Sequence, residues 1–537
     1  MSSVSRHATV RLGRVVANTG RDVLVLIDSH AEERPTLRMG DVVLAAGRNE
    51  PAVGVISGIN APAPGLEGDG EDLWVIQVEL TGSLKSDGDV PVYSRGVPAS
   101  PALGSVVHLA TTPDLKLLHR NADETALPIG DVQGINGVKA TVDPDMLLDG
   151  GFAIMGASGT GKSASLACIV RALLRARFPI HALLIDPYNE FGTSFGKAAS
   201  VIEPRPGLFP HWLLTYDELV WVLSMSGDDL DRDERALLDQ AIPSARRNFL
   251  QRHGQIMGSE GVSIDAPIPY RVTDLLTFIE KAAEDLGHSL AVRSRLRGRL
   301  MTAIADPRLS IIFGTAATTD NLSTLLCDLF RLDRSPPLAV LQLGRLTAGL
   351  DKLIVSVVCR LAAALAEWSG ISRHTLVLMD NAERYAPAEV QDEASRFARD
   401  AIRVLGGRPR KLGTALGLTA SSPRNIDRDV LIRCGTMFLH RMPSTLDGDA
   451  VEEILSEPAP ACIDSLGALQ QREAMTVGRG ISFAGRVMMS ELPAVAIPGS
   501  RPMPTLGEDI ETEIAETINR WRRFGAGEAP PSADNAA

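Results

Sequence analysis

The chain has 537 residues, of which 45% are hydrophobic and 22% charged, so it can bury one large core and smaller ones in about two to four domains. It has no uninterrupted apolar run of the roughly 18–20 residues that cross a bilayer, and residues 1–7 lack the apolar run of a secretory signal. We therefore expect a cytoplasmic protein with no membrane segment.

The cysteines exclude two kinds of site, and the net charge limits how the protein could bind nucleic acid. The five cysteines are scattered, without a CxxC pair or a histidine at metal-ligand spacing, which indicates neither a disulfide framework nor a zinc site. The net charge is −12, so the field of the whole protein does not attract DNA at long range. Basic groups that contact nucleic acid would have to be concentrated on an internal surface.

The first 110 residues contain short β-branched runs separated by glycine and polar turns. The runs are Arg11–Ala17, Asp22–Ile27, Asp41–Ala45, Ala52–Ile56 and Leu73–Leu80. Their even spacing predicts a small closed β-barrel over residues 1–110. Between the last two runs, the composition of Asn60–Gly70 predicts a surface loop.

From about residue 150 the pattern changes to apolar strands that alternate with helices. The strands are Phe152–Met155, Ala182–Ile185, Leu338–Leu343, Thr375–Met379, Ala415–Thr419 and Met437–Leu439. Near-continuous apolar strands of this kind predict an α/β fold in which helices cover both faces of a parallel sheet. We assign residues 111–204 and 336–490 to this core.

Residues 205–335 form a predicted helical insertion in the core. Its helices are Asp217–Met225, Asp231–Gln251, Thr273–Leu286 and Leu290–Ala305. Four arginines, at positions 293, 295, 297 and 299, alternate on the last of these helices, so Arg293 and Arg297 share a face. They could line a DNA channel, but a solvated surface of the insertion is favoured. Residues 491–537 form a C-terminal segment, and the composition of Gly525–Ala537 predicts disorder.

One motif carries specific chemistry, a phosphate-binding loop of the pattern G-x-x-x-x-G-K-[ST]. It consists of Gly156, Ala157, Ser158, Gly159, Thr160, Gly161, Lys162 and Ser163. An apolar strand enters it, and the helical run Ala164–Arg177 leaves it with the positive end of its dipole at the phosphates. Lys162 is predicted to contact the β- and γ-phosphates of ATP, and the Ser163 hydroxyl to bind Mg²⁺.

Two apolar strands end in acidic residues. Thr375–Asp380 places Asp380 at the carboxyl end of a strand, where open α/β sheets bind ligands, so Asp380 is the candidate magnesium ligand. The alternative is that Asp380 only caps the next helix. Asn381 follows where many such ATPases carry a catalytic glutamate, and an amide can orient a water but cannot take its proton.

The second acidic strand is Ala182–Glu190, in which Glu190 lies four residues after Asp186. Both carboxylates could face the magnesium and the attacking water. The alternative is a strand-end aspartate followed by a turn that begins at Pro187.

The order of these features resembles the HerA branch of the HerA–FtsK superfamily of hexameric DNA motors. Gly13–Ile59 resembles the N-terminal HAS barrel of that family, Pro101–Leu109 its approach to the ATPase core, and Leu469–Met475 the stretch that braces an adjacent subunit. Asp380–Pro387 stands where the family has an Asp/Glu-Glu-Ala-His motif. The resemblance runs through most of the chain and implies a RecA-like P-loop NTPase core.

The resemblance also implies roles for further residues and marks departures. Arg410, in an Arg-Lys-x-Gly stretch, would reach the nucleotide of the neighbouring subunit. Asn381 replaces a glutamate, Glu383 a histidine and Ser422 a glutamine that senses nucleotide, and Pro409 stands where a glycine is usual. Nucleotide binding is therefore more strongly implied than rapid hydrolysis.

Two functions from different classes follow from the resemblance. The first is a homohexameric ATPase that moves double-stranded DNA and works with a NurA-type nuclease, a sirtuin-like protein or another nuclease subunit in anti-phage defence. The second is an assembly scaffold that binds ATP to hold its ring together and to activate the effector, with little translocation. For hydrolysis, Glu190 is the first candidate to activate the water and Glu383 the second.

Overall fold

The computed structural model describes residues 10–28, 36–47, 50–60, 74–87, 90–97, 99–119, 125–176, 180–225, 227–254, 262–314, 319–332, 334–368, 374–407, 413–455, 461–499, 514–516, 518–519 and 522. The chain divides into two compact units. The first comprises the described residues within Met1–Phe178 and Ala415–Pro493, and the second those within Pro179–Thr414 and Ala494–Ala537.

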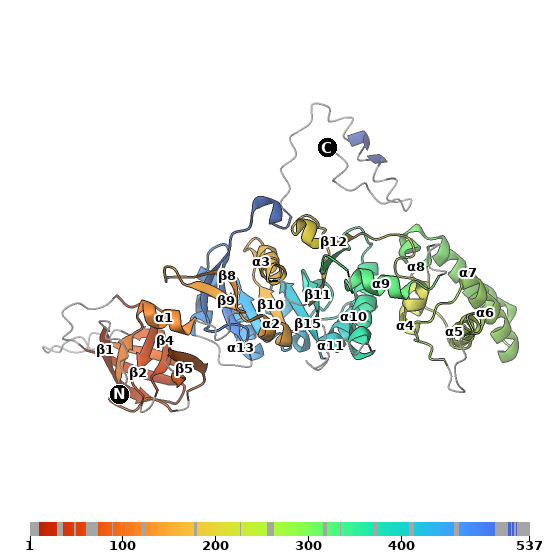
Figure 1. The fold of residues 1–537 in the computed structure, drawn as a ribbon. Coiled ribbons are helices and arrows are strands. Elements are labelled where there is room, and N and C mark those ends of the chain that lie inside the picture. The colour runs from red at the N-terminus through yellow and green to blue at the C-terminus, as the bar shows by residue number, and fades with distance from the viewer. Residues whose placement is uncertain are drawn as a thin grey trace. The chain divides into compact units, whose positions relative to one another are not determined.

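The first unit begins with a closed β-barrel, as the sequence predicts (Figure 1). Its strands are β1 (Arg11–Asn18), β2 (Asp22–Ile27), β3 (Val42–Ala45), β4 (Ala52–Asn60), β5 (Val75–Asp87), β6 (Val90–Arg95) and β7 (Val106–Leu109). Six of them close the ring in the order β1-β2-β5-β4-β3-β7, and β6 pairs with β5 outside it. Alternating apolar residues such as Leu12, Val25 and Val107 fill its interior, because successive side chains of a strand point to opposite faces.

The rest of the first unit is a mixed sheet with short helices. Parallel strands β15 (Thr414–Ala420), β10 (Phe152–Met155) and β16 (Thr436–Leu439) are followed across the sheet by antiparallel β17 (Glu473–Gly478), β18 (Gly485–Met489), β8 (Leu127–Val132) and β9 (Lys139–Val142). The helices are α1 (Thr112–Leu118), α2 (Pro144–Gly150), α3 (Lys162–Arg175), α12 (Arg428–Leu431) and α13 (Thr445–Ile454). Every residue of β10 is buried, which explains its unbroken apolar sequence.

The second unit has a four-stranded parallel sheet in the order β12-β13-β11-β14. The strands are β12 (Ala199–Ile202), β13 (Leu338–Gln342), β11 (Ile180–Asp186) and β14 (His374–Met379). The helices α9 (Leu322–Leu329), α10 (Leu350–Trp368) and α11 (Glu393–Gly406) accompany it, and α10 packs against both α11 and β14. The predicted α/β fold with a P-loop core is thus confirmed.

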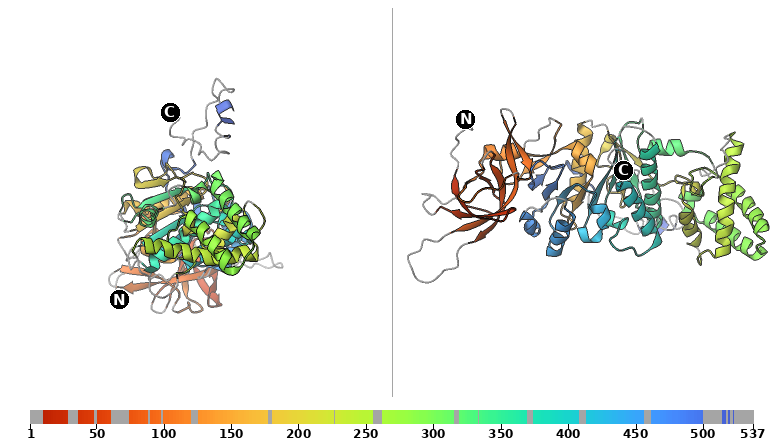
Figure 2. Two further views of the ribbon diagram at one scale, coloured as in Figure 1. Left: turned by 90° about the vertical axis from the view of Figure 1, so that its right-hand side faces the viewer. Right: turned by 90° about the horizontal axis from the view of Figure 1, so that it is seen from below.

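The helical insertion is also confirmed, and its helices pack against one another (Figure 2). They are α4 (Tyr216–Ser224), α5 (Arg232–Arg252), α6 (Val272–Leu286), α7 (Leu290–Ala305) and the single turn α8 (Ser310–Phe313). Asp231 and Glu234 form a capping box that begins α5, and Gly287 ends α6 in the left-handed conformation (φ +72°).

Within these described stretches, no helix is long and apolar enough to span a bilayer. Of the predicted loop Asn60–Gly70, the first residue ends β4. Residues 61–70 and the predicted disordered tail at 525–537 lie outside the described residues.

Candidate functional site

The P-loop connects β10 to α3 and has the backbone conformation that its glycines predict. Gly156, Gly159 and Gly161 have φ angles of +154°, +77° and +106°, which L side chains rarely adopt. A Cβ on Gly156 would lie 2.6 Å from the Cβ of His440, so no larger residue fits there. Across the loop, the Lys162 ammonium donates to the Ala157 carbonyl at 3.1 Å.

The start of α3 is suited to an anion. Gly161 is its N-cap residue, and no side chain caps the N–H groups of the first turn. Lys162 and Ser163 open this turn and are both half-buried, while Ser158 and Gly159 at the crest of the loop are exposed. The uncapped N–H groups and the ammonium therefore fit the phosphates of a nucleotide.

A buried histidine, His440, holds the P-loop helix against the sheet. It directly follows β16 and is fully buried. Its Nδ1 lies 2.9 Å from the carbonyl oxygen of Glu473, and its Nε2 lies 2.9 Å from the Ser165 hydroxyl on α3. The carbonyl can only accept, so Nδ1 carries the proton and Ser165 donates to Nε2. Burial lowers the pKa of His440 to about 4, and the charge of Lys162 adds to this, so the ring is neutral.

Arg472 supports the other side of the same loop. Its backbone N–H donates to the Thr160 carbonyl at 3.1 Å, and its guanidinium donates to the Met489 carbonyl at 2.9 Å. Its φ of +67° is unusual for a residue with a side chain. Neither His440 nor Arg472 was predicted from the sequence as part of this site, because neither belongs to a motif of the nucleotide site and both contact it through tertiary structure alone.

In the second unit, Asp186 and Glu190 lie in one loop at the end of β11. Asp186 is fully buried, and its carboxylate accepts from the N–H groups of Glu190 at 3.0 Å and Phe191 at 2.8 Å. Burial raises the pKa of Asp186, although these N–H donors favour its charged form. In this structure the Asp186 carboxylate therefore shapes the loop that carries Glu190.

Asp380 ends the neighbouring strand β14 at the same level as Asp186, because Ile185 and Met379 are paired in register. It is almost completely buried, and the Asn381 amide donates to its carboxylate at 3.2 Å. Asn381 itself is left-handed, with φ +49° and ψ +54°. The structure thus places both predicted strand-end acids at the carboxyl edge of one sheet, where α/β proteins bind ligands.

The structure gives less support to a role in the nucleotide site for the remaining predicted residues, and two of them lie outside the described residues. Glu383 is half-buried in a short 3₁₀ turn (Ala382–Arg384) after Asn381. Ser422 donates to the Asp447 carboxylate at 2.6 Å. Arg410 and Pro409 fall in residues 408–412, outside the described residues.

Three arginines of α7 pair with acidic side chains of the insertion. Arg295 bonds Asp231 at 2.5 Å, Arg297 bonds Glu280 at 3.0 Å, and Arg299 lies 3.3 Å from the buried Glu234. These pairs neutralise the charge that a DNA channel would need, which favours the solvated-surface interpretation.

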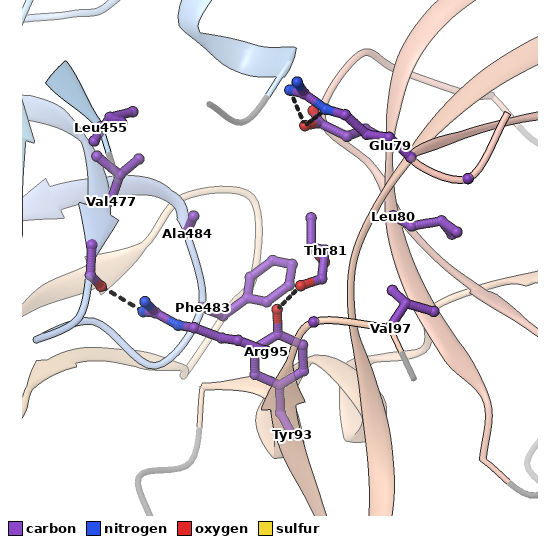
Figure 3. Close-up of a pocket in the computed structure, with 14 residues that line it drawn as sticks. Glu79, Leu80, Thr81, Tyr93, Arg95, Val97, Leu455, Val477, Phe483 and Ala484 are labelled. Atoms are coloured by element: carbon purple, nitrogen blue, oxygen red, sulfur yellow. Dashed lines mark hydrogen bonds and ion pairs between the residues drawn. The ribbon is translucent and has the colours of Figure 1, made fainter. Parts of the chain in front are cut away.

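A separate cavity of about 610 Å³ lies in the first unit between the barrel and β17 (Figure 3). Arg95 reaches across it and donates to the carbonyls of Gly478, at 2.5 Å, and Ile481. Tyr93 packs edge-on against Phe483 on its floor. No residue of 156–163 is among the described lining residues, so this cavity is distinct from the P-loop.

Among solved structures, the chain is similar to VirB4 of Thermoanaerobacter pseudethanolicus, with a TM-score of 0.49 and 16% identity over 70% of this chain and 98% of that one. It is also similar to the plasmid coupling protein TrwB in complex with ADP and Mg²⁺, with a TM-score of 0.43 and 14% identity over 71% of this chain and 92% of that one.

Two sequence comparisons cover the P-loop and its surroundings. Residues 127–362 match the family model described as the central domain of helicase HerA. The DNA double-strand break repair helicase HerA of Pyrococcus furiosus is 22% identical over 97% of this chain and 94% of its own length. The matched region contains the P-loop and the Asp186–Glu190 loop that the structure describes. The P-loop thus lies in a region that is similar to the central domain of helicase HerA.

Proposed function

We propose that this chain binds ATP with Mg²⁺ at Gly156–Ser163 and hydrolyses it. The observation that carries the proposal is the uncapped N-terminus of α3 behind a loop with three left-handed glycines. Lys162 would neutralise phosphate charge, and Ser163 and Asp380 would hold the metal. Bound MgATP supplies the phosphoanhydride bond and the cation that polarises it.

Glu190 is the proposed general base, and Asp186 contributes by fixing the loop that presents it. The two hydrogen bonds from the loop N–H groups to Asp186 support this division of roles. Asn381 can orient the attacking water through its amide but cannot accept the proton. Glu383 is the second candidate base. We infer slow basal turnover.

We further propose that the protein assembles as a homohexameric ring. An arginine that acts in trans, the role proposed for Arg410, needs the nucleotide at a head-to-tail interface, and such interfaces can close into rings. The name of the Pyrococcus furiosus relative, a DNA double-strand break repair helicase, supports double-stranded DNA as the substrate. The partner would be a NurA-type nuclease, a sirtuin-like protein or another nuclease subunit in anti-phage defence.

A scaffold that uses ATP mainly to hold an effector assembly together is the second candidate function. Two observations favour it: the amide at Asn381, and the net charge of −12, which opposes long-range attraction to DNA. An ATP-dependent displacement of a triplex-forming strand from double-stranded DNA supports the motor. Effector activation by ATP without strand displacement supports the scaffold.

Lys162→Ala tests the nucleotide site, with the exposed Lys197→Ala as a matched control for the loss of a lysine. A charge-assisted hydrogen bond is worth about 1.5–3 kcal/mol, so calorimetry should record at least a tenfold weaker ATP affinity for Lys162→Ala only. Unchanged affinity in Lys162→Ala would contradict the assignment of the P-loop.

Turnover tests the proposed base. Glu190→Gln should lower the basal ATPase rate to a small residual value, while Asn381→Glu should raise the rate, because a positioned base contributes about 10²–10⁴ in rate. Asn381→Gln is the control for the added side-chain length.

Native mass spectrometry with MgATP should detect six copies per particle, and a stable monomer at micromolar concentration would contradict both functions.

A further inference from the structure

Gly499 in the C-terminal segment contacts the loop that carries Glu190. Both residues belong to the second compact unit. The Gly499 N–H donates to the Glu190 carbonyl at 3.0 Å, although more than 300 residues separate them in the sequence. Gly499 follows a 3₁₀ turn (Ala494–Ala496) and has a φ of +70°.

The main chain of Glu190 is therefore fixed on both sides. Its N–H donates to Asp186 and its carbonyl accepts from Gly499. The adjacent Asn189 is held as well, since its side-chain oxygen accepts from the Gly344 N–H at 3.0 Å. With the backbone held, the position of the Glu190 carboxylate depends on its side-chain torsions and on what lies beside it.

The bare α-carbon of Gly499 lies beside that carboxyl group. A Cβ built on Gly499 would lie 3.3 Å from Cδ of Glu190, 3.5 Å from Oε1 and 3.6 Å from Cγ. The first of these distances is tighter than ordinary van der Waals contact, so a methyl group would require the carboxylate to shift by a few tenths of an ångström. The positive φ independently favours glycine at this position.

We propose that Gly499 is a positioning residue that sets the place of the Glu190 carboxylate, so the C-terminal segment takes part in hydrolysis. The inference rests on the proposed role of Glu190 as general base. A displacement of about 1 Å in a catalytic group can reduce the rate about 10²-fold. We therefore expect Gly499→Ala to lower kcat about 10-fold and to change the KM for ATP less than twofold, because the phosphate-binding residues are untouched.

Gly287→Ala is a matched control for the backbone strain. Gly287 has a φ of +72°, close to that of Gly499, but nothing lies within 4 Å of the position of its added Cβ. A kcat like that of the unaltered protein in Gly287→Ala, with a lowered kcat in Gly499→Ala, supports the inference. Equal kcat values in both variants and the unaltered protein overturn it.

A double-mutant cycle shows whether Gly499 acts through Glu190. In the Glu190→Gln background, Gly499→Ala should reduce the residual rate no further, because the group that it displaces is already inactive. The same fold reduction in both backgrounds would overturn the inference even if Gly499→Ala lost some stability. If Glu190→Gln retained full turnover, the proposed base would be wrong, which is a different outcome from a harmless Gly499→Ala.

Discussion

His440 allows a sharp test of how the P-loop helix is held. The substitution His440→Asn can keep a donor to the Glu473 carbonyl, because the asparagine amide lies near the place of Nδ1, but it cannot reach Ser165. The buried Ser165 hydroxyl would then lose its partner at Nε2. An unsatisfied buried polar group costs about 1–3 kcal/mol, so we expect that loss of unfolding free energy at pH 8.

The lowered pKa of His440 makes the free energy of unfolding depend on pH. The pKa of His440 is about 4 in the folded protein and 6.5 in the unfolded chain. Between these values only the unfolded state binds the proton, so the stability of the unaltered protein falls as pH falls below 6.5. The fall is about 1.4 kcal/mol per pH unit, or about 3 kcal/mol in all.

His440→Asn lacks this titration, so its disadvantage should shrink on acidification and vanish or reverse near pH 5. Urea unfolding of both proteins from pH 8 to pH 4.5 measures the difference. The half-buried His119 and the buried His211, whose pKa values are also lowered to about 4, are present in both proteins and cancel from this difference. A constant difference across this range would refute the buried, neutral state of His440.

Three further outcomes follow from single contacts. Gly156→Ala should abolish ATP binding in calorimetry while the protein stays folded by circular dichroism, because its Cβ would collide with His440. Glu218→Ala should cost about 3 kcal/mol in urea unfolding, since the buried Glu218 carboxylate accepts from Arg360 at 2.5 Å across α4 and α10, and its loss leaves that cation unpaired. Arg297→Ala should leave the affinity for DNA and its salt dependence unchanged in fluorescence anisotropy, because Glu280 already neutralises this arginine.

The sequence was sufficient for the elements whose signal is local. Unbroken apolar runs predicted β10, β11, β13, β14, β15 and β16 to within two residues at each end, because a strand buried on both faces must be apolar throughout. The four longer helices of the insertion followed from apolar residues at three- and four-residue spacing. β8, β9, β17 and β18 were not predicted. Strands near a sheet edge carry polar residues on their open face, as Arg486 of β18 illustrates with its half-buried side chain.

The residues of the candidate site also fall into those with a local sequence signal and those without one. The P-loop was predictable because its conformation needs glycine at fixed spacing and its charge needs one lysine. His440, Arg472 and Gly499 were not predictable, since each contacts its partner across a long sequence separation. Asp186 was found by its place at a strand end, but only the structure shows its two oxygens bonded to the N–H groups of its own loop.

Asn381 illustrates why phosphate binding and water activation can diverge in one chain. Its backbone is left-handed, a conformation that asparagine tolerates better than glutamate through local hydrogen bonds of its short side chain. Its amide donates to Asp380, so the residue also holds the candidate metal ligand in place. A glutamate there would add a base but would also strain the turn by about 1 kcal/mol and place a second negative charge beside Asp380. Asparagine therefore stabilises the strand end, and in the proposed mechanism the proton is accepted instead by Glu190, whose backbone is fixed in the loop after the neighbouring strand β11.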